Sequence, residues 1–388
     1  MGNFFSNLLN SLNLSGLFKK DLLGRQKGSV IGIDIGSSSI KMVQLSRKNG
    51  HPILETYGEL SLGPYVGKNI GEATNLPQEK IIEAINDMLK EKEVNITTRN
   101  CGLAIPFASS LITVIDMPAM PKEQLAQMIP LEARKYVPVP ISEVTLDWYI
   151  VPKDQNPESD SSPKTEGENK PAQEKVDVLI VALHNDTIVR YKEIVAKTEL
   201  DAKFFEIEIF STMRSILDQE VVPTLIIDMG ATNTKLYMVE RGILISSHMI
   251  TRGSQSITNE LSRSLGISIT EAEVLKREKG LSGVADDMHT KDVITVTLNY
   301  IFSEANRVLL AYQKKYNKNV SSVVLVGGGS ALKGLAPVAK RSFQTDVVAG
   351  DPFSKVVAPA FLEKILRETG PQFAVAVGVA LRCLQEFD

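Results

Sequence analysis

The chain has 388 residues, with 43 lysines and arginines against 46 aspartates and glutamates, and its net charge at pH 7 is −3. This length exceeds what one hydrophobic core usually serves, so we expect roughly two to four domains or subdomains. A hydrophobic share of 43% and a charged share of 23% exclude a disordered or coiled-coil chain. Because positive charge is not in excess, we expect no nucleic acid as the main partner.

The cysteines and histidines do not form a metal-binding pattern. Cys101 and Cys383 lie far apart and outside any Cys-x-x-Cys pair, and the four histidines lack the spacing that places two imidazoles on one helix face. No apolar run reaches the roughly 18 residues needed to cross a bilayer, and no secretory signal opens the chain. We therefore expect a protein of a reducing compartment, the cytoplasm.

The first predicted segment, residues 1–27, is an amphipathic arm. Its apolar side chains recur at helical spacing; they are Phe4, Phe5, Leu8, Leu9 and Leu12. Two roles stay open for this arm. It can dock on its own domain, or residues 1–24 can make a peripheral contact with a membrane surface or a partner.

Three strands open the first domain, followed by a helix and a fourth strand. β-Branched residues punctuated by glycine predict a strand, a tight turn and a strand over 30–45, and a third strand over 53–60. An apolar stripe predicts a helix over 79–90, and residues 100–106 resemble the next strand.

A compact α+β insert is predicted next. Its strands are expected at 111–117, 144–151 and 176–183, and its helices at 122–136 and 185–200, with Asn185 as a candidate cap. Residues 152–175 are rich in Pro, Ser, Glu and Lys and nearly lack apolar residues. Such a composition predicts a long mobile hairpin tip, with a docking segment as the alternative.

After a strand predicted at 204–209, the opening pattern begins again. Strands are predicted at 224–228, 235–239, 243–249 and 322–326, and helices at 254–265, 268–279 and 293–316. A last apolar helix begins at Pro371 and is expected to pack on the first domain. The predicted domains are the arm (1–27), a first domain (28–107, 201–222 and 371–388), the insert (108–200) with its tip (152–175), and a second domain (223–370).

One short motif stands at the head of both halves. It reads Asp-x-Gly-x-[Ser/Thr]-x-x-Lys, first from Asp34 to Lys41 and again from Asp228 to Lys235. Each copy follows an apolar strand and precedes another strand. Two copies in matching surroundings indicate an internal duplication.

The motif suits a phosphate chain with a metal ion. A glycine-bearing hairpin aims backbone N–H groups at one point, and hydroxyl groups add donors. The predicted phosphate-binding residues are Gly36, Ser37, Ser38, Ser39, Gly230, Ala231, Thr232 and Asn233. Asp34 and Asp228 are the predicted magnesium ligands, through water, because Mg²⁺ prefers carboxylate, water and phosphate oxygens. The alternative is a pair of ordinary hairpins that use Asp and Ser as turn residues.

These paired turns, a glycine run after a late strand and the terminal helix resemble the actin-like ATPase superfamily. Within it the chain is most similar to the type IV pilus assembly family PilM, which is related to the cell-division protein FtsA; the likeness extends over about 30–384. The resemblance implies an α/β fold of the duplicated, RNase H-like actin type with an FtsA/PilM-type α+β insert. It also implies ATP and Mg²⁺ as cofactors.

The resemblance adds further site residues. It implies that Lys41 contacts phosphate, that Gly327, Gly328 and Gly329 form the adenosine loop, and that Glu273 and Lys276 lie over the nucleoside; without it, this last pair reads as solvated helix charges. Glu208 falls where chaperone ATPases orient the attacking water, with a buried interdomain carboxylate as the alternative. Ile209 and Phe210 replace the Pro-Thr of the chaperones, so at most weak ATPase activity is expected.

The implied function is that of an ATP-binding component of the type IV pilus assembly machine. The implied partners are the cytoplasmic N-terminal peptide of a PilN-like inner-membrane protein and other inner-membrane components of the pilus machine. The protein would then lie in the cytoplasm, associated peripherally with the inner membrane through these partners. Two alternatives stay open within the superfamily: a small-molecule kinase and a self-polymerising filament protein.

Overall fold

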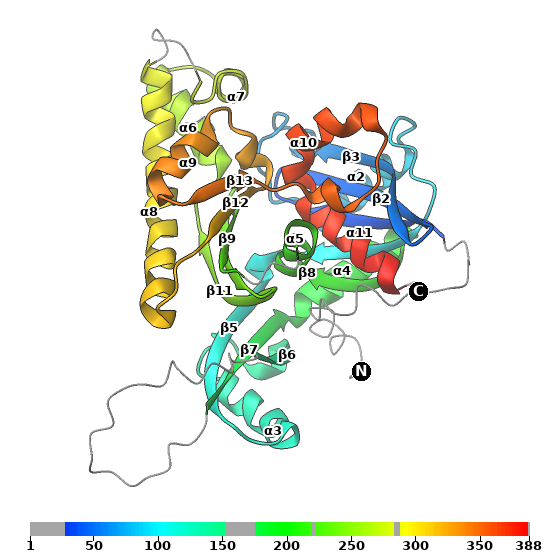
Figure 1. The fold of residues 1–388 in the computed structure, drawn as a ribbon. Helices are drawn as coiled ribbons and strands as arrows, with labels where there is room; N and C mark the ends of the chain where they lie inside the picture. The colour runs from blue at the N-terminus through cyan, green and yellow to red at the C-terminus, as the bar shows by residue number, and fades with distance from the viewer. Residues whose placement is uncertain (1–27, 152–174, 219–221, 283–287, 387–388) are drawn as a thin grey trace.

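The computed structural model describes residues 28–151, 175–218, 222–282 and 288–386. The arm predicted at 1–27 and nearly all of the hairpin tip predicted at 152–175 lie outside the described residues. Within the described ranges, no helix is long and apolar enough to cross a membrane. The described residues form three β-sheets, two of which share the same strand order. Figure 1 shows how the sheets and helices are arranged.

The first sheet has five strands in the order β3-β2-β1-β4-β8. Neighbouring strands are antiparallel from β1 to β3, whereas β4 runs parallel to β1 and β8 parallel to β4. The strands are β1 (Val30–Ile35), β2 (Ser39–Lys48), β3 (His51–Ser61), β4 (Asn100–Ile105) and β8 (Asp201–Ile207). The central strand β1 is almost wholly apolar because both faces of the sheet are covered.

The second sheet repeats this arrangement in the order β11-β10-β9-β12-β13, with the same parallel and antiparallel pairs. Its strands are β9 (Thr224–Met229), β10 (Thr234–Glu240), β11 (Ile243–Ile250), β12 (Ser322–Val326) and β13 (Asp346–Ala349). The predicted duplication is therefore confirmed, and it extends to a fifth strand, β13, that the sequence did not indicate.

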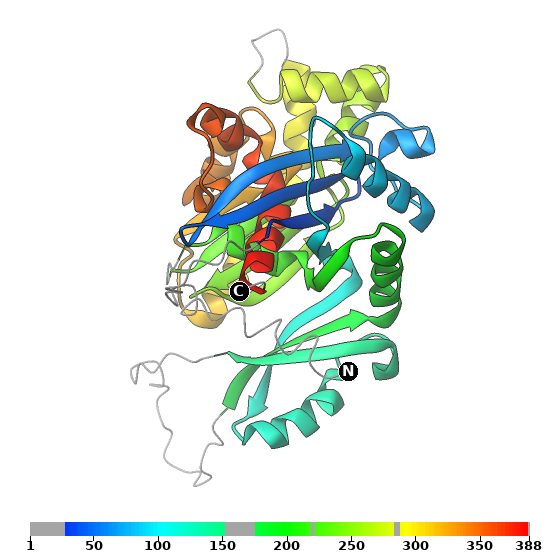
Figure 2. The same ribbon diagram turned by 90° about the vertical axis from the view of Figure 1, so that its right-hand side faces the viewer.

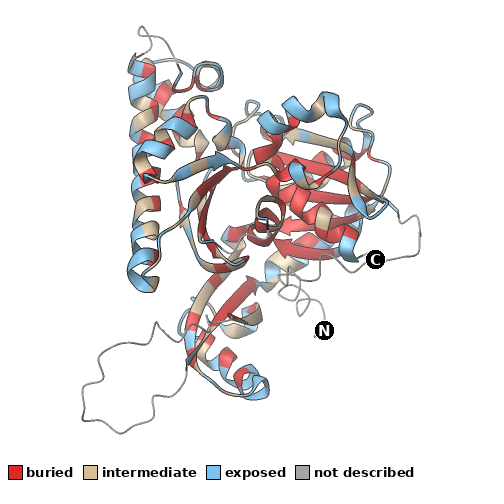
Figure 3. Cartoon of the chain, viewed as in Figure 1, coloured by how far each residue is buried: buried red, intermediate tan, exposed pale blue. Residues whose placement is uncertain are grey.

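Helices cover both faces of the first sheet. On one face, α2 (Gln78–Lys90) and α4 (Asn185–Lys197) share a core with β1, β2 and β4. On the other, α11 (Ala374–Glu386) packs against β1 and β2, as predicted for the last helix. Figure 3 shows that the central strands of this sheet and α11 are largely buried, whereas the edge strand β3 is mostly half-buried. A short 3₁₀ turn, Gly370–Phe373, holds Pro371 and precedes α11.

The helix α11 lies very close to its neighbours. A Cβ atom on Gly32 of β1 would stand 2.0 Å from the carbonyl oxygen of Ala376, and a Cβ atom on Gly378 would stand 1.9 Å from the carbonyl oxygen of Ser211. Ser211 belongs to α5 (Glu208–Ile216), which lies between the two halves of the molecule (Figure 1). Glycine is required at both positions because no other residue allows such a close approach.

A buried ionic cluster fastens α5 and α11 to β8. The Glu206 carboxylate is fully buried and accepts hydrogen bonds from Arg214 at 2.6 Å, from Arg382 at 2.9 Å and from Ser211 at 2.5 Å. Burial alone would raise the pKa of Glu206, but the two guanidinium groups lower it to about 2. The cluster is therefore ionised throughout the physiological range.

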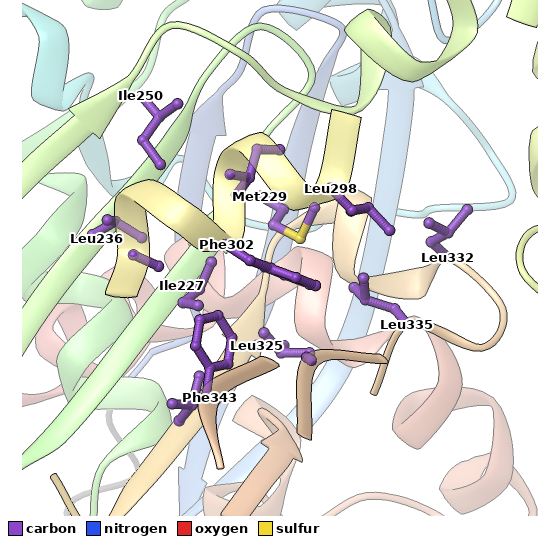
Figure 4. Packing of buried hydrophobic residues seen from close by; sticks show 14 of the residues in the cluster. Ile227, Met229, Leu236, Ile250, Leu298, Phe302, Leu325, Leu332, Leu335 and Phe343 are labelled. Atoms are coloured by element: carbon purple, nitrogen blue, oxygen red, sulfur yellow. The ribbon is translucent and has the colours of Figure 1, made fainter. Parts of the chain in front are cut away.

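Among the described residues, α6 (Ser254–Leu265), α8 (Met288–Tyr316) and α9 (Leu335–Phe343) cover the outer face of the second sheet, and α7 (Ile269–Glu278) packs on α6. Figure 4 shows Phe302 of α8 beside Phe343 of α9, in an edge-on contact with ring centroids 5.0 Å apart. α9 and the short α10 (Glu363–Thr369) were not predicted from the sequence.

The insert is a three-stranded antiparallel sheet in the order β5-β7-β6, formed by β5 (Ser110–Pro118), β6 (Val144–Val151) and β7 (Lys175–His184). It extends away from the two larger sheets (Figure 2). One of its faces carries α3 (Lys122–Ala133), and the other packs against α5 and the second sheet.

Two local predictions were wrong. The strand predicted at 204–209 ends at Ile207, and Glu208 begins α5. The alternating apolar residues of 204–209 are typical of a strand. In the structure, residues 204–207 belong to β8, and residues 208–209 belong to a helix that is buried on most sides. Asn185 does not cap α4; its side chain instead donates to the Ser142 carbonyl at 3.0 Å and accepts from Thr145 at 2.8 Å.

Candidate functional site

The two repeated motifs form hairpins with the same register. Asp34 at the end of β1 pairs with Lys41 on β2, and Asp228 at the end of β9 pairs with Lys235 on β10. The seven-residue spacing of the motif therefore places its carboxylate and its ammonium group opposite each other across the hairpin. The sequence repeat is thus a repeat of geometry.

The turns themselves close in the same way. The N–H of Gly36 donates to the Ser39 carbonyl at 3.0 Å, and the N–H of Gly230 donates to the Asn233 carbonyl at 2.9 Å. The turns also meet, because Thr232 lies within hydrogen-bonding distance of Ser37, at 3.4 Å between the hydroxyl oxygens. Hydroxyl groups and backbone N–H groups from both halves therefore gather in one place.

A cavity of about 670 Å³ lies between the two halves, with both turns on its wall. This size falls within the range of small-molecule sites. The predicted site residues that line it are Asp34, Gly36, Ser37, Ser38, Lys41, Glu208, Asp228, Gly230, Ala231, Thr232, Asn233, Glu273, Lys276, Gly327, Gly328 and Gly329. One predicted residue, Ser39, is not on the wall. It is buried and accepts a hydrogen bond from Lys41 at 2.7 Å.

The glycine run after β12 lies against the second turn. Gly327 has a φ of +81°, and a Cβ atom there would stand 2.4 Å from Oδ1 of Asp228. Its N–H donates to the carbonyl of Pro371 at 2.9 Å, just before α11. Both the left-handed backbone and the close approach require glycine, so this loop brings main chain rather than side chains to the cavity.

On α7, Lys276 is buried and Glu273 is partly buried, so the two are not solvated helix charges. Lys276 donates to Glu273 at 2.6 Å and to Thr258 at 2.9 Å, and Thr258 donates to Glu273 at 2.6 Å. Burial raises the pKa of Glu273, but Lys276 and these hydrogen bonds lower it below its usual value overall. A carboxylate and an amino group joined by a short hydrogen bond therefore line the cavity.

Carboxylates gather at the inner end of the cavity. Burial raises the pKa of Asp34 to about 6, although Lys41 opposes the shift. Burial alone would lower the pKa of Lys235, but Asp228, 3.3 Å away, and Glu208, 2.6 Å away, raise it above its usual value. Each half thus contributes one aspartate beside a lysine.

This donor set fits magnesium with a phosphate chain better than a metal held by protein alone. Among the described residues, no group of three or more His, Cys, Asp or Glu side chains is arranged to hold a metal ion. Mg²⁺ in nucleotide sites uses one or two carboxylates and takes its other ligands from water and phosphate. Asp34 and Asp228 supply that number of carboxylates.

Glu208, the predicted water-orienting residue, already has partners for both oxygens. Oε1 accepts from the N–H of Phe107 at 2.6 Å, and Oε2 accepts from Lys235 at 2.6 Å. The carboxylate is buried. These contacts match the alternative that the sequence left open, a buried carboxylate between domains.

Several residues of the cavity wall were not named as site residues from the sequence. Lys235 could have been found, because the repeat marks it as the counterpart of Lys41. Glu59 lies 3.3 Å from Lys41 across the β2–β3 pair, and Arg190 and Tyr191 reach the wall from α4. No local signal marks these three, because only tertiary folding brings them to the cavity.

The duplicated sheets with facing turns define the actin-like ATPase fold. The profile of the family described as type IV pilus assembly protein PilM matches residues 32–384. The chain belongs to this family.

Solved structures share the fold. The structure of a PilM-PilN type IV pilus biogenesis complex contains a chain that is 23% identical; the match covers 92% of this chain and 98% of that one, with a TM-score of 0.74. A crystal structure of MreB 5 of Spiroplasma citri bound to AMPPNP is 12% identical, covers 94% of this chain and 98% of its own, and gives a TM-score of 0.52.

Curated relatives match over a shorter region. The cell division protein FtsA of Rhizobium meliloti (strain 1021) is 25% identical over 196 residues, which are 44% of this chain and 43% of that protein. FtsA of Agrobacterium fabrum is 26% identical over the same length. The chain thus spans less than half the length of the curated relatives it matches.

Proposed function

We propose that this protein binds Mg-ATP in the cavity between its two halves and acts as a nucleotide-dependent component of type IV pilus assembly. The observation that carries the proposal is the pair of turns with matching strand register that both line the cavity. One turn alone is a common hairpin. Two turns, each with an aspartate at its strand end, suit a phosphate chain and its metal from both sides.

Each part of the wall has a role in this proposal. Backbone N–H and hydroxyl groups of the two turns hold the phosphates, and Asp34 and Asp228 hold Mg²⁺, in part through water. The glycine run at 327–329 and the Glu273–Lys276 pair lie at the nucleoside end. The similar MreB 5 structure has AMPPNP bound, which is consistent with a nucleotide in this fold.

The proposed partner is the N-terminal cytoplasmic peptide of a PilN-like inner-membrane protein. The similar chain in the PilM-PilN complex supports this partner, and membrane association would then occur through it. The insert contacts both α5 and the second sheet, so closure of the two halves on a nucleotide can alter the insert. The protein would thereby couple its nucleotide state to assembly.

Saturating Mg-ATP is expected to stabilise the protein against unfolding. At a hundredfold excess over the dissociation constant, binding to the folded state alone adds about 2.7 kcal/mol. In Asp34→Asn and Asp228→Asn, the magnesium-dependent part of this gain should be lost, because a neutral amide is a poor magnesium ligand. Thermal melts with ATP, in the presence of either magnesium or EDTA, measure the total gain in stability and its magnesium-dependent part.

The matched control is Asp346→Asn, which changes an exposed carboxylate on β13, outside the cavity wall. It should keep the full magnesium-dependent gain. If the two cavity variants also keep it, the assigned metal ligands are wrong.

Peptide binding is tested with a fluorescent peptide of the PilN-like partner's N-terminus, using a scrambled peptide as control. Fluorescence anisotropy should show binding of the native peptide, and Mg-ATP should change its affinity by about tenfold, a typical coupling between two sites. An equal affinity for both peptides would refute the proposed partner.

A further inference from the structure

The insert begins at a single hydrogen-bonded residue. β4 of the first sheet ends at Ile105, and Phe107 starts a short 3₁₀ turn, Phe107–Ser109, that leads directly into β5 of the insert. The N–H of Phe107 donates to Oε1 of Glu208 at 2.6 Å. Glu208 is the first residue of α5, so a side chain from the centre of the molecule holds the main chain at the root of the insert.

The same carboxylate reaches the cavity. Oε2 of Glu208 accepts a hydrogen bond from Lys235 at 2.6 Å, and Lys235 also lies 3.3 Å from Asp228 at the end of β9. Lys235, Asp228 and Glu208 all line the cavity, whereas Phe107 does not. Glu208 therefore joins a lysine of the second turn to the first residue of the insert root through its two oxygens.

A second, apolar contact also connects β10 with Phe107. Tyr237 lies two residues after Lys235 on β10, and so on the same face of the strand. Its ring packs edge-on against Phe107, with centroids 6.0 Å apart. Both rings belong to one buried cluster that joins α5, the second sheet and the insert; its other members include Ile112, Leu179, Val181, Phe210, Met213 and Leu244.

The charges around Lys235 show how a bound nucleotide can act on the connection from the cavity to Phe107. Lys235 is the cation shared by Asp228 and Glu208. A phosphate chain entering the cavity brings further anionic oxygens that compete with Glu208 for the ammonium group. A magnesium ion held by Asp228 weakens the other attraction that fixes Lys235. The Glu208–Lys235 bond therefore differs between the empty and the occupied cavity.

We propose that Glu208 is a positioning residue that couples occupancy of the cavity to the anchoring of the insert through Phe107. This inference rests on the proposed binding of Mg-ATP in the cavity. When phosphate draws Lys235 away, the Glu208 carboxylate loses the cation that fixes its orientation against Phe107, which loosens the root of the insert. This role differs from activation of an attacking water, because it is exerted on the insert and needs no hydrolysis.

The backbone amide of Phe107 reports the loosening of the insert root directly. Labelling with ¹⁵N-phenylalanine gives signals from only the 13 phenylalanines of the chain, and loss of the Phe107 signal in Phe107→Leu assigns it. Hydrogen exchange of this amide should be about tenfold faster with saturating Mg-ATP than without it, which is a coupling of typical size. Calorimetry on the same samples measures Mg-ATP binding independently.

Glu208→Gln removes the ion pair with Lys235 but keeps an oxygen that can accept from Phe107. In this variant Mg-ATP should still bind, while the Phe107 amide exchanges at the same rate with and without it. Glu208→Asp is the second variant, because its side chain keeps the charge but is too short to bridge both partners; it should also lose the response. Melting temperatures confirm that both variants are folded.

Tyr237→Phe is the matched control. It keeps the ring against Phe107 and removes only a hydroxyl group that makes no hydrogen bond within the described part of the chain, so it should respond as the wild type does. The inference is overturned if wild type binds Mg-ATP without a change at Phe107, or if Glu208→Gln keeps the response. Absence of Mg-ATP binding to wild type would overturn both this inference and the proposed function.

Discussion

Replacing Glu206 by glutamine is expected to lower the free energy of unfolding by about 3–5 kcal/mol, the usual cost of removing one member of a buried ionic cluster. The variant leaves Arg214 and Arg382 buried next to each other without their shared carboxylate. Glutamine keeps the shape of the side chain, so the loss reflects charge rather than packing. Urea denaturation followed by circular dichroism measures it.

The effect of Glu206→Gln on the free energy of unfolding is expected to depend on pH. The pKa of Glu206 is about 2 in the folded protein and lies near the ordinary value of 4.5 in the unfolded chain. Stabilisation by its charge is therefore complete above pH 4.5 and is lost as the pH falls toward 2. The difference in unfolding free energy between wild type and Glu206→Gln should shrink over that window.

Glu386 provides the control, because it also contacts Arg382, at 3.2 Å, but is partly exposed. Glu386→Gln should cost less than about 1 kcal/mol, as expected of exposed ion pairs. Equal losses in the two variants would show that burial of the Glu206 cluster is not the cause.

Gly378→Ala is expected to destabilise the protein by about 3 kcal/mol or more, at the upper end of overpacking effects. The added methyl group would stand 1.9 Å from the Ser211 carbonyl oxygen, which is main chain and cannot rotate away. α11 and α5 would have to separate, and α5 begins with Glu208. Denaturant midpoints measure the loss.

Gly28→Ala is the matched substitution at an open position, where the nearest atom to the new methyl group is 3.9 Å away. Its effect should stay within about 0.5 kcal/mol, as at ordinary surface positions. If Gly378→Ala destabilises the protein as little as Gly28→Ala does, α11 and α5 can adjust to the added methyl group. The close contact between Gly378 and Ser211 then does not fix the position of α5.

The parts of the site that were predictable are those encoded locally. A short motif sets the turn, the strand pairing and the placement of Asp34 opposite Lys41, because all of these depend on residues within one hairpin. Duplication then predicted a second such hairpin, and the structure places both on one cavity. Ser39 shows the limit of this reasoning, because membership of the motif does not decide which side chains point outward.

The remaining parts depend on contacts between distant segments. Lys235 and Glu208 are 27 residues apart, and Phe107 and Glu208 are 101 apart; no local spacing relates them. The helix predicted at 185–200 was assigned to the insert, yet α4 packs its Tyr191 and Ile194 into the core of the first sheet. The helix α5 was missed because its first residues, Glu208 and Ile209, continue the alternating apolar pattern of β8.

Because α11 packs on β1 of the first sheet, the first half of the molecule is finished after the second half during translation. The core beneath α11 combines Val30 and Val43 with Val377 and Ala380, whereas every strand of the second sheet lies between Thr224 and Ala349. The ribosome therefore delivers a complete second sheet before the first sheet receives its covering helix. Until then, the nascent chain exposes an apolar face of the kind that chaperones protect.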